Sequence, residues 1–387
     1  MSLRDIPKVW FGEVNAMIMT ICASNNRNAI VDGYVGLINH FHNKKELIAI
    51  IPGLCKSEEF DSEIHSLVFE HFRNKGKIAS KLYCLSFYIR LAQLAKQETV
   101  EGIFIYSDSE WPNLVHLMIP TLRKIKTTVF IHDPKHHSGE QKIIRFIRRF
   151  AYPFYARKAT CILSYEKAKS EIVEIHPIFK EAKLVSVRLP SMSVMEFQDL
   201  RQVAEQHNAA LEYDLIFYGR LEAYKGVDLL LQANQYLHTT GRSVRIVIIG
   251  GRGELKEEVK KAAAQDPSIT FLDDYISNRA LAEYIVKSRA VILPYRDATG
   301  TQTIQIANYY YKPVIVNRVG CFDEYVVEGK NGFFISEMTP EGVGETIHST
   351  LEQMAGLDYN PANLRETFDA FFDIDNIARE IEDIIQG

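Results

Sequence analysis

The fold is decided by the stretch Asp214-Leu-Ile-Phe-Tyr-Gly-Arg-Leu-Glu-Ala-Tyr-Lys-Gly226. Its apolar start predicts a buried strand that ends at Gly219, with Arg220 just beyond the strand end and Lys225 in the loop that follows. The apolar run 227–231 then begins a helix. Ligands of parallel α/β sheets bind at the carboxyl ends of strands, and a helix start beside Arg and Lys suits a diphosphate. The same two cations on a solvated surface loop would show this pattern as well.

The residues after this stretch continue the alternation of strands and helices. Strands of this kind, separated by helices of this length, predict a parallel, doubly wound sheet. We expect strands at 215–218, 243–249, 269–272, 290–293 and 314–317, and helices at 227–238, 254–265, 278–288 and 301–311.

The first half of the chain shows the same alternation and predicts a second sheet of the same type. We expect its strands at 16–23 (with 9–11 as the alternative first strand), 46–51, 102–106, 127–131 and 159–164, and helical regions at 29–41, 57–96, 113–124 and 141–158, the last with a break near Pro153.

The segment 189–213 carries a proline, loses the strand pattern and becomes polar, which is typical of a connection between domains. The expected fold class is therefore α/β, with two Rossmann-like doubly wound domains that face a cleft. We place the first domain at 1–192, the linker at 193–212, the second domain at 213–362, and a C-terminal helix pair at 363–387 that returns towards the first domain.

The composition narrows the class of protein. With 47% apolar residues and a formal charge of −4, the chain is typical of a soluble globular protein and argues against a nucleic-acid binder. Its five cysteines are widely spaced and form no metal-binding pattern, which indicates reduced thiols in a cytoplasmic protein. No apolar run approaches the roughly 18 residues needed to cross a bilayer.

Two strand ends of the second half offer further ligand contacts. Gly250 and Gly251 follow an expected strand, and glycine lets the backbone approach a bound group closely. The next strand ends in 271–276, where Tyr275 could stack on a nucleobase and Ile276 could offer main-chain groups. Ordinary turns and polar loops would account for either stretch equally well.

The stretch 293–304 is more informative. Gly300, Thr301, Gln302 and Thr303 stand where an expected helix begins, so their backbone N–H groups would be free to meet a phosphate. Alternatively, a threonine here simply caps the helix, and both roles are compatible.

In this order, the pieces resemble the nucleotide-binding domain of the retaining GT-B glycosyltransferases of family 4, the glycosyl transferases group 1. The resemblance covers about 213–336 and implies that Arg220 and Lys225 hold the donor diphosphate, while the N–H groups of 300–303 meet the distal phosphate and the sugar. The matched pieces are Gly219-Arg220, Lys225-Gly226, the glycine-ended strand before 250, Pro294, Lys312-Pro-Val-Ile, Gly320 with Glu324, and Asn331-Gly332.

The chain departs from the family at its pair of glutamates. Their positions hold Ala298 and Ile306, so the usual carboxylate contact to the donor ribose is missing, and Gln305 or Asp297 would have to replace it. The run 298–305 resembles a subgroup that makes bacterial surface polysaccharides. A catalytically inactive relative would also lack these glutamates.

The first half adds the segment 130–140, which follows an expected strand. It resembles a segment of the same subgroup and implies that His132 shapes the sugar side and that Asp133 and His137 contact the acceptor or the sugar. A polar loop is the plain alternative. Its histidines also suggest a metal, but no second cluster completes a ligand set, so we expect no metal.

The segment 142–158 combines arginines with aromatic residues at helical spacing. Such a helix can lie on an anionic membrane surface, which suits an acceptor carried on a polyprenyl lipid. A helix that packs against the core and leaves a basic face in water would show the same pattern.

The resemblance implies an enzyme without metal or cofactor. It would be a hexosyltransferase that moves a sugar, with retention, from a UDP- or GDP-linked donor to a glycan or lipid-linked glycan. Its expected place is the cytoplasm, peripheral to the inner face of the plasma membrane. A nucleotide-sugar epimerase of the same shape and a non-catalytic sugar-nucleotide binder remain as alternatives. The acidic pairs Asp108/Glu110 and Asp373/Asp375 match a DxD-type metal motif only by coincidence, and we assign them no metal.

Overall fold

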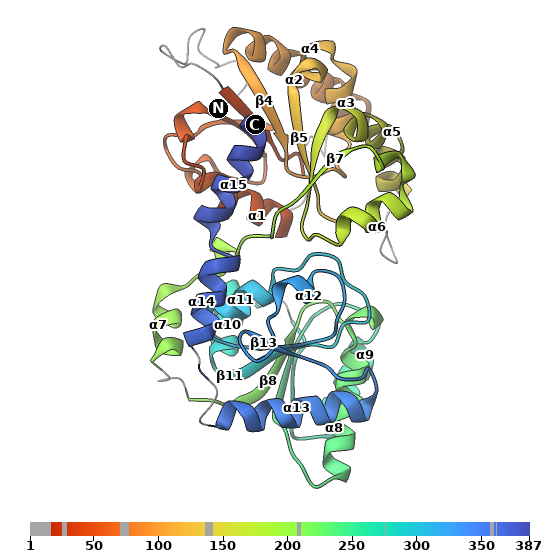
Figure 1. The fold of residues 1–387 in the computed structure, drawn as a ribbon, viewed down its shortest axis with the longest axis vertical. Coiled ribbons are helices and arrows are strands. Elements are labelled where there is room, and N and C mark those ends of the chain that lie inside the picture. The colour runs from red at the N-terminus through yellow and green to blue at the C-terminus, as the bar shows by residue number, and fades with distance from the viewer. Residues whose placement is uncertain are drawn as a thin grey trace. The chain divides into compact units, whose positions relative to one another are not determined.

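The protein is described from a computed structural model that covers residues 17–24, 29–69, 77–135, 142–206, 210–274, 276–356, 360 and 362–387. It divides into two compact units, of which the first comprises Met1–Pro190 with Ile374–Gly387 and the second Ser191–Asp373. Each unit is a parallel sheet covered by helices (Figure 1). The predicted fold class, two Rossmann-like α/β domains, is confirmed.

In the first unit, the described residues form a seven-stranded parallel sheet in the order β3-β2-β1-β4-β5-β6-β7. Strands β1 and β2 are almost entirely apolar and are buried at every position, as expected for parallel strands covered on both faces. The strands are β1 Met17–Ile21, β2 Leu47–Pro52, β3 His65–Phe69, β4 Val100–Ile105, β5 Lys126–Ile131, β6 Ala159–Leu163 and β7 Lys183–Ser186.

The helices of this unit lie on both faces of the sheet. The C-terminal helix α15 packs beside α1 and against β4 and β5, while α3 contacts both α2 and α5 (Figure 1). The helices are α1 Ala29–Asn39, α2 Lys77–Gln97, α3 Pro112–Met118, α4 Pro120–Lys124, α5 Lys142–Lys158, α6 Ala168–Ile175 and α15 Ile374–Gln386.

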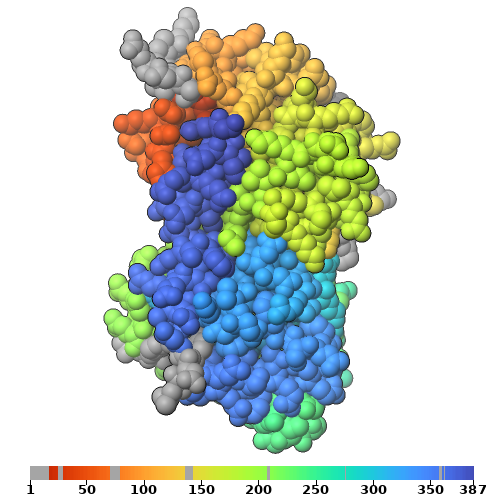
Figure 2. Space-filling model, in the orientation of Figure 1, coloured from red at the N-terminus to blue at the C-terminus, as the bar shows by residue number. Residues whose placement is uncertain are grey.

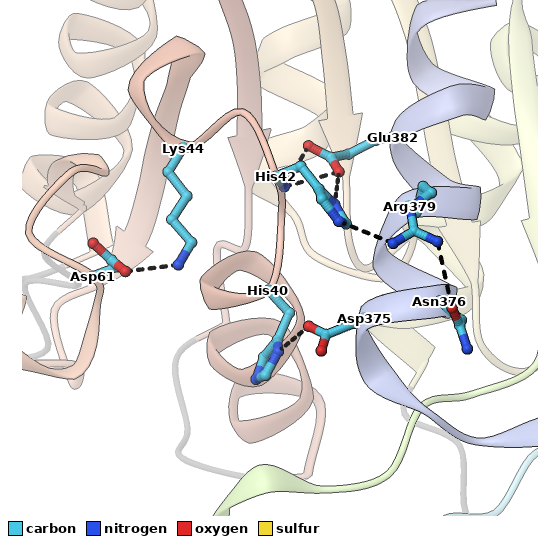
Figure 3. Close-up of polar contacts among 8 residues, drawn as sticks. All are labelled: His40, His42, Lys44, Asp61, Asp375, Asn376, Arg379 and Glu382. Carbon is cyan, nitrogen blue, oxygen red and sulfur yellow. Dashed lines mark hydrogen bonds and ion pairs between the residues drawn. The ribbon is translucent and has the colours of Figure 1, made fainter. Parts of the chain in front are cut away.

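A buried carboxylate on α15 holds this helix against the loop that follows α1. Glu382 accepts a hydrogen bond from the backbone N–H of His42 at 3.0 Å and pairs with the His42 ring at 3.0 Å (Figure 3). It also accepts from the backbone N–H of Asn43 at 3.2 Å. A second pair, His40 with Asp375 at 2.7 Å, is more exposed. In the space-filling view the blue C-terminal helix lies against the orange N-terminal residues (Figure 2).

Glu382→Ala is therefore expected to lower the free energy of unfolding by about 2 kcal/mol, because two backbone N–H groups at a partly buried contact lose a charged acceptor. The matched control is Asp375→Ala, which removes an exposed pair and should cost less than about 1 kcal/mol. Urea denaturation of both variants checks this. Equal losses would show that α15 is not held by Glu382.

In the second unit, the described residues form a six-stranded parallel sheet in the order β10-β9-β8-β11-β12-β13. The strands are β8 Tyr213–Tyr218, β9 Ile246–Ile249, β10 Ile269–Leu272, β11 Ser288–Leu293, β12 Val314–Val316 and β13 Gly332–Phe334. The helices are α7 Gln198–Glu205, α8 Val227–Thr239, α9 Lys256–Gln265, α10 Asn278–Val286, α11 Thr303–Tyr309, α12 Phe322–Tyr325, α13 Pro340–Ala355 and α14 Ala362–Phe371.

Three expectations for helices in the first unit were wrong. The region 57–96 includes strand β3, an edge strand too short to show a clear alternation in the sequence. The helix expected at 113–124 is two helices, since Pro120 begins α4 and keeps the preceding residue extended. Conversely, α5 continues through Pro153, with buried residues on both sides of the proline.

The segment expected as a linker has structure of its own. Residues 193–212 lie in the second unit and include α7, whose amphipathic pattern is only two turns long. The alternative first strand at 9–11 lies outside the described residues. Within the described ranges, no helix combines the length and apolarity needed to cross a membrane.

Candidate active site

The strand order of the second unit defines where a ligand can bind. From β8 the chain adds β9 and β10 on one side, and it then returns to add β11, β12 and β13 on the other. The order therefore reverses between β8 and β11, and ligands of such sheets bind beyond the carboxyl ends of the strands at this point. The loops concerned are 219–226 after β8 and 294–302 after β11.

Two cations meet at this point. Lys225 donates from Nζ to the Tyr295 hydroxyl at 2.9 Å and lies 4.8 Å from the centre of its ring, which joins the two loops. Exposed Arg220 donates from Nη2 to the Tyr224 hydroxyl at 3.3 Å. Among the described residues, neither cation forms an ion pair with a carboxylate. The site thus presents positive charge that the protein itself does not neutralise, as a diphosphate site requires.

Burial lowers the pKa of Lys225 below its ordinary value, and the positive charge of Arg220 lowers it further, although Tyr224 and Glu222 act in the opposite sense. A bound anion would oppose both lowering effects, because negative charge close to an ammonium favours its protonated form. Lys225 is therefore poised to gain from an anionic ligand.

The loop that carries these cations is held rigidly. Gly226 has a φ of +68°, and a Cβ there would lie 1.9 Å from the Pro294 carbonyl oxygen, so only glycine fits. Arg296 forms two 2.8 Å bonds to the Asp228 carboxylate, and its backbone N–H donates to the Tyr224 carbonyl at 2.7 Å. The β8 and β11 loops consequently form one preorganised body.

The predicted glycines have a packing role. Gly219 has a φ of +122°, and a Cβ there would lie 3.1 Å from the Lys225 ammonium. A Cβ on Gly250 would lie 2.5 Å from the Gly219 carbonyl oxygen, so this glycine lets the β9 loop approach the β8 loop. Gly251 follows on the same loop and is half-buried. Donor contacts from these glycines remain a prediction.

The start of α11 differs in detail from the expectation. The helix begins at Thr303, so Gly300, Thr301 and Gln302 are loop residues. The Thr303 N–H donates to the Thr301 hydroxyl at 3.2 Å and is already engaged, although Thr301 lies one residue before the cap position, which Gln302 holds. Gln305, proposed as a substitute ribose contact, is fully buried on α11. The other substitute, Asp297, is exposed on the β11 loop.

Two of the predicted residues, Tyr275 and His137, lie outside the described residues. Ile276 is half-buried beyond β10, the edge strand, two strands away from β8. Sequence reasoning missed Tyr295, the partner of Lys225. Its signal was its place directly after Pro294 at a strand end, which becomes informative only once β8 and β11 are known to be neighbours.

The first unit has a corresponding reversal between β1 and β4. Beyond β4, the buried Asp108 accepts hydrogen bonds from Arg148 Nε at 2.9 Å and from the Tyr152 hydroxyl at 3.0 Å. The pKa of Glu110 is raised to about 7, chiefly by burial. The charge of Asp108 also raises this pKa, while a hydrogen bond with Ser24 acts in the opposite sense. These two carboxylates are therefore built into this edge of the sheet, a placement that the sequence did not suggest.

His132 follows β5 at the same edge. Its Nε2 lies 2.7 Å from the Tyr106 carbonyl oxygen, which can only accept, so Nε2 carries the proton. Burial lowers the pKa of His132, which keeps the ring neutral near pH 7 and leaves Nδ1 as a hydrogen-bond acceptor. The ring stacks on Phe130 at 4.5 Å. The next residue, Asp133, is half-buried.

Within the described ranges, no group of three or more His, Cys, Asp or Glu side chains could hold a metal ion.

Residues 201–366 match the family model described as Glycosyl transferases group 1. The chain is 30% identical over 101 residues to a GDP-mannose:glycolipid 4-beta-D-mannosyltransferase of Xanthomonas campestris, a match covering 26% of this chain and 29% of that protein. It is 31% identical over 131 residues to a glycogen synthase of Thermus thermophilus, a match that covers 33% of this chain and 29% of that protein. The matches thus span less than a third of these relatives.

The structure is similar to that of Anabaena Alr3699/HepE, solved in complex with UDP. The TM-score is 0.69 at 14% identity, over 96% of this chain and 100% of that one. At this identity the likeness concerns the fold alone. Residues 201–366 are therefore similar to the Glycosyl transferases group 1 family, and the chain as a whole shares the fold of two Rossmann-like domains with this structure.

Proposed function

We propose that the protein is a retaining glycosyltransferase that moves a hexose from a UDP- or GDP-sugar to a glycan or lipid-linked oligosaccharide in bacterial polysaccharide biosynthesis. The observation that carries the proposal is the pair Arg220 and Lys225, unneutralised at the strand reversal of the second unit. The names of the relatives are consistent with it, since one uses GDP-mannose and a glycolipid and one structure holds UDP.

In the proposed reaction, the bond between the sugar C1 and the diphosphate oxygen breaks while the acceptor hydroxyl oxygen bonds to C1 from the same face. The acceptor proton passes to the leaving phosphate oxygen, so the protein needs no strong general base. Its task is to stabilise negative charge on the departing diphosphate, which preorganised cations do well. Arg220 and Lys225 fill this role, and no metal is required.

The acceptor side is assigned to the first unit. The neutral His132 offers Nδ1 to a sugar or acceptor hydroxyl, and Asp133 lies beside it. We further propose that the enzyme works in the cytoplasm, at the inner face of the plasma membrane, where α5 meets the surface that carries a polyprenyl-linked acceptor. Retention is tested by the anomeric configuration of the product, read by NMR. A product of inverted configuration would overturn the mechanism.

A non-catalytic sugar-nucleotide binder is the second candidate, because Ala298 and Ile306 replace the family glutamates. Incubation of a nucleotide-sugar with and without acceptor separates the candidates. Transfer that requires the acceptor supports the transferase, and isomerisation without acceptor would identify an epimerase. If neither product forms, the protein is a non-catalytic sugar-nucleotide binder.

The first test is a thermal-shift panel with UDP, GDP, dTDP, ADP and CMP. One nucleoside diphosphate at about 100 times its Kd is expected to stabilise the protein by roughly 2.7 kcal/mol. Arg220→Ala should abolish the shift, and Lys260→Ala, an exposed cation on α9, should keep it. If no diphosphate shifts the transition, the loop 219–226 is not a diphosphate site.

A further inference from the structure

The helices on one face of the first sheet have an unusual charge. The sequences of α2, α3, α4 and α5 contain no Asp or Glu, while α2 contributes four Lys or Arg residues, α4 two and α5 six. The whole chain has a formal charge of −4. Helix α15, packed with α1, carries four acidic residues. The unit is therefore polarised, with its cations gathered on the α2–α5 layer.

The same layer exposes large apolar side chains. Of the twelve large hydrophobic residues exposed among the described ranges, seven lie on α2, α3 and α5, and two more lie at the end of the neighbouring helix α6, which itself contains two glutamates. Met118 on α3 is 74% exposed, and Phe146 and Phe150 on α5 are 53% and 54% exposed. Because α3 contacts both α2 and α5, these residues belong to one continuous layer. Apolar side chains that project among cations are typical of a surface that lies on an anionic bilayer.

A pocket of about 380 Å³ opens on this layer, between α5 and the turn after α6. Three arginines, Arg145, Arg148 and Arg149, line it together with Tyr152 and His176. Its rim carries two exposed apolar residues, Ile175 and Ile178. Guanidinium groups gathered around a small pocket bind phosphate oxygens, and no carboxylate lines this one.

The three arginines differ in what they can offer a ligand. Arg148 is buried and paired with Asp108 at 2.9 Å, so it anchors the pocket floor to the end of β4. Arg145 and Arg149 are exposed, one helical turn apart, and in the part of the chain that the structure describes they have no ion pair or hydrogen bond. Their charges are available to an external anion.

We propose that this pocket binds the phosphate of an anionic membrane lipid while Phe146, Phe150 and Met118 enter the lipid around it. The inference rests on the membrane association proposed above and names its recognition site. A lipid fits better than a soluble phosphate because the exposed Ile175 and Ile178 line the pocket and the helix that supplies its arginines also exposes two phenylalanines, which gain nothing from a water-soluble ligand.

The test is flotation of the full-length protein with vesicles of phosphatidylcholine alone or mixed with phosphatidylglycerol. The wild type is expected to float only with the anionic vesicles. A cation near an anionic surface contributes about fivefold to binding, so the double variant Arg145→Gln, Arg149→Gln should bind about thirtyfold more weakly. Both residues are exposed and unpaired within the described ranges, so the variant should keep the wild-type melting temperature.

The matched control is Arg157→Gln with Lys158→Gln, which removes two exposed cations from the same helix but outside the pocket. It should retain most of the binding. If the two double variants lose vesicle binding equally, the pocket is not the lipid site and the binding depends only on the overall positive charge of the helix. A wild type that does not float would overturn membrane association itself, while the nucleoside-diphosphate panel would still judge the transferase independently.

A separate experiment tests whether the pocket binds a soluble phosphate instead of a lipid. Inorganic phosphate is added in a thermal-shift assay to the wild type and to the Arg145→Gln, Arg149→Gln variant. Stabilisation of the wild type alone, without flotation, would assign the pocket to a soluble phosphate and overturn the lipid. Flotation that is lost with Phe146→Ser and Phe150→Ser would support lipid entry.

Discussion

Arg220→Ala and Lys225→Ala are each expected to lower the rate of sugar transfer by about 10²–10³-fold, the loss typical when one preorganised group that stabilises transition-state charge is removed. Arg220 is exposed and, among the described residues, it forms a single hydrogen bond, which it donates to the Tyr224 hydroxyl at 3.3 Å, so its removal should not disturb folding. Initial rates at saturating acceptor measure the effect. Lys260→Ala, an exposed cation on α9, is the control and should keep the wild-type rate.

The pH dependence adds a second readout for the same site. Lys225 must be protonated to stabilise the diphosphate, and burial lowers its pKa below the ordinary 10.5. Its charge is therefore lost at a lower pH than that of a free lysine, and the rate should fall as the pH rises through the lowered pKa. Lys225→Ala should remove this alkaline decline. Near-normal turnover in Arg220→Ala would contradict the assignment of the diphosphate site.

The part of this site that lies within one stretch could be predicted from the sequence. A strand that ends at Gly219 and delivers Arg220 and Lys225 to a loop is a local pattern, and the structure reproduces it. Tyr295 could not be found in this way, because its contact with Lys225 spans 70 residues and depends on β8 and β11 being neighbours. Strand order is a non-local property that apolar periodicity does not reveal.

For the fold, too, local patterns could be predicted from the sequence and non-local packing could not. Continuous apolar runs such as β2 predicted central strands well, because strands buried on both faces need apolar residues at every position. The edge strand β3 was missed, since its half-buried positions give no such run. In the first unit, the burial of Asp108 and Glu110 could not be predicted either, as it arises from the packing of α5 beyond β4.

Asp108→Ala is expected to lower the free energy of unfolding by about 3–5 kcal/mol, the loss typical when one partner of a buried ion pair is removed. The Arg148 side chain is 5% exposed, and its Nε donates to this carboxylate at 2.9 Å. Without the carboxylate, the guanidinium must remain buried with less compensation or pull α5 away from β4. Urea denaturation measures the loss. Asp323→Ala, whose partner Arg318 is exposed, is the control and should cost less than about 1 kcal/mol.

A double variant separates the buried charge from the loss of packing. Replacing Asp108 by Leu together with Arg148 by Met removes both charges and keeps apolar volume, so it should recover most of the stability lost in Asp108→Ala. If the double variant is as unstable as the single one, the hydrogen bond from Tyr152 to Asp108 is the essential contact instead. Because Arg148 also lines the phosphate pocket, recovered stability combined with lost flotation would show that this arginine serves lipid binding as well as the fold.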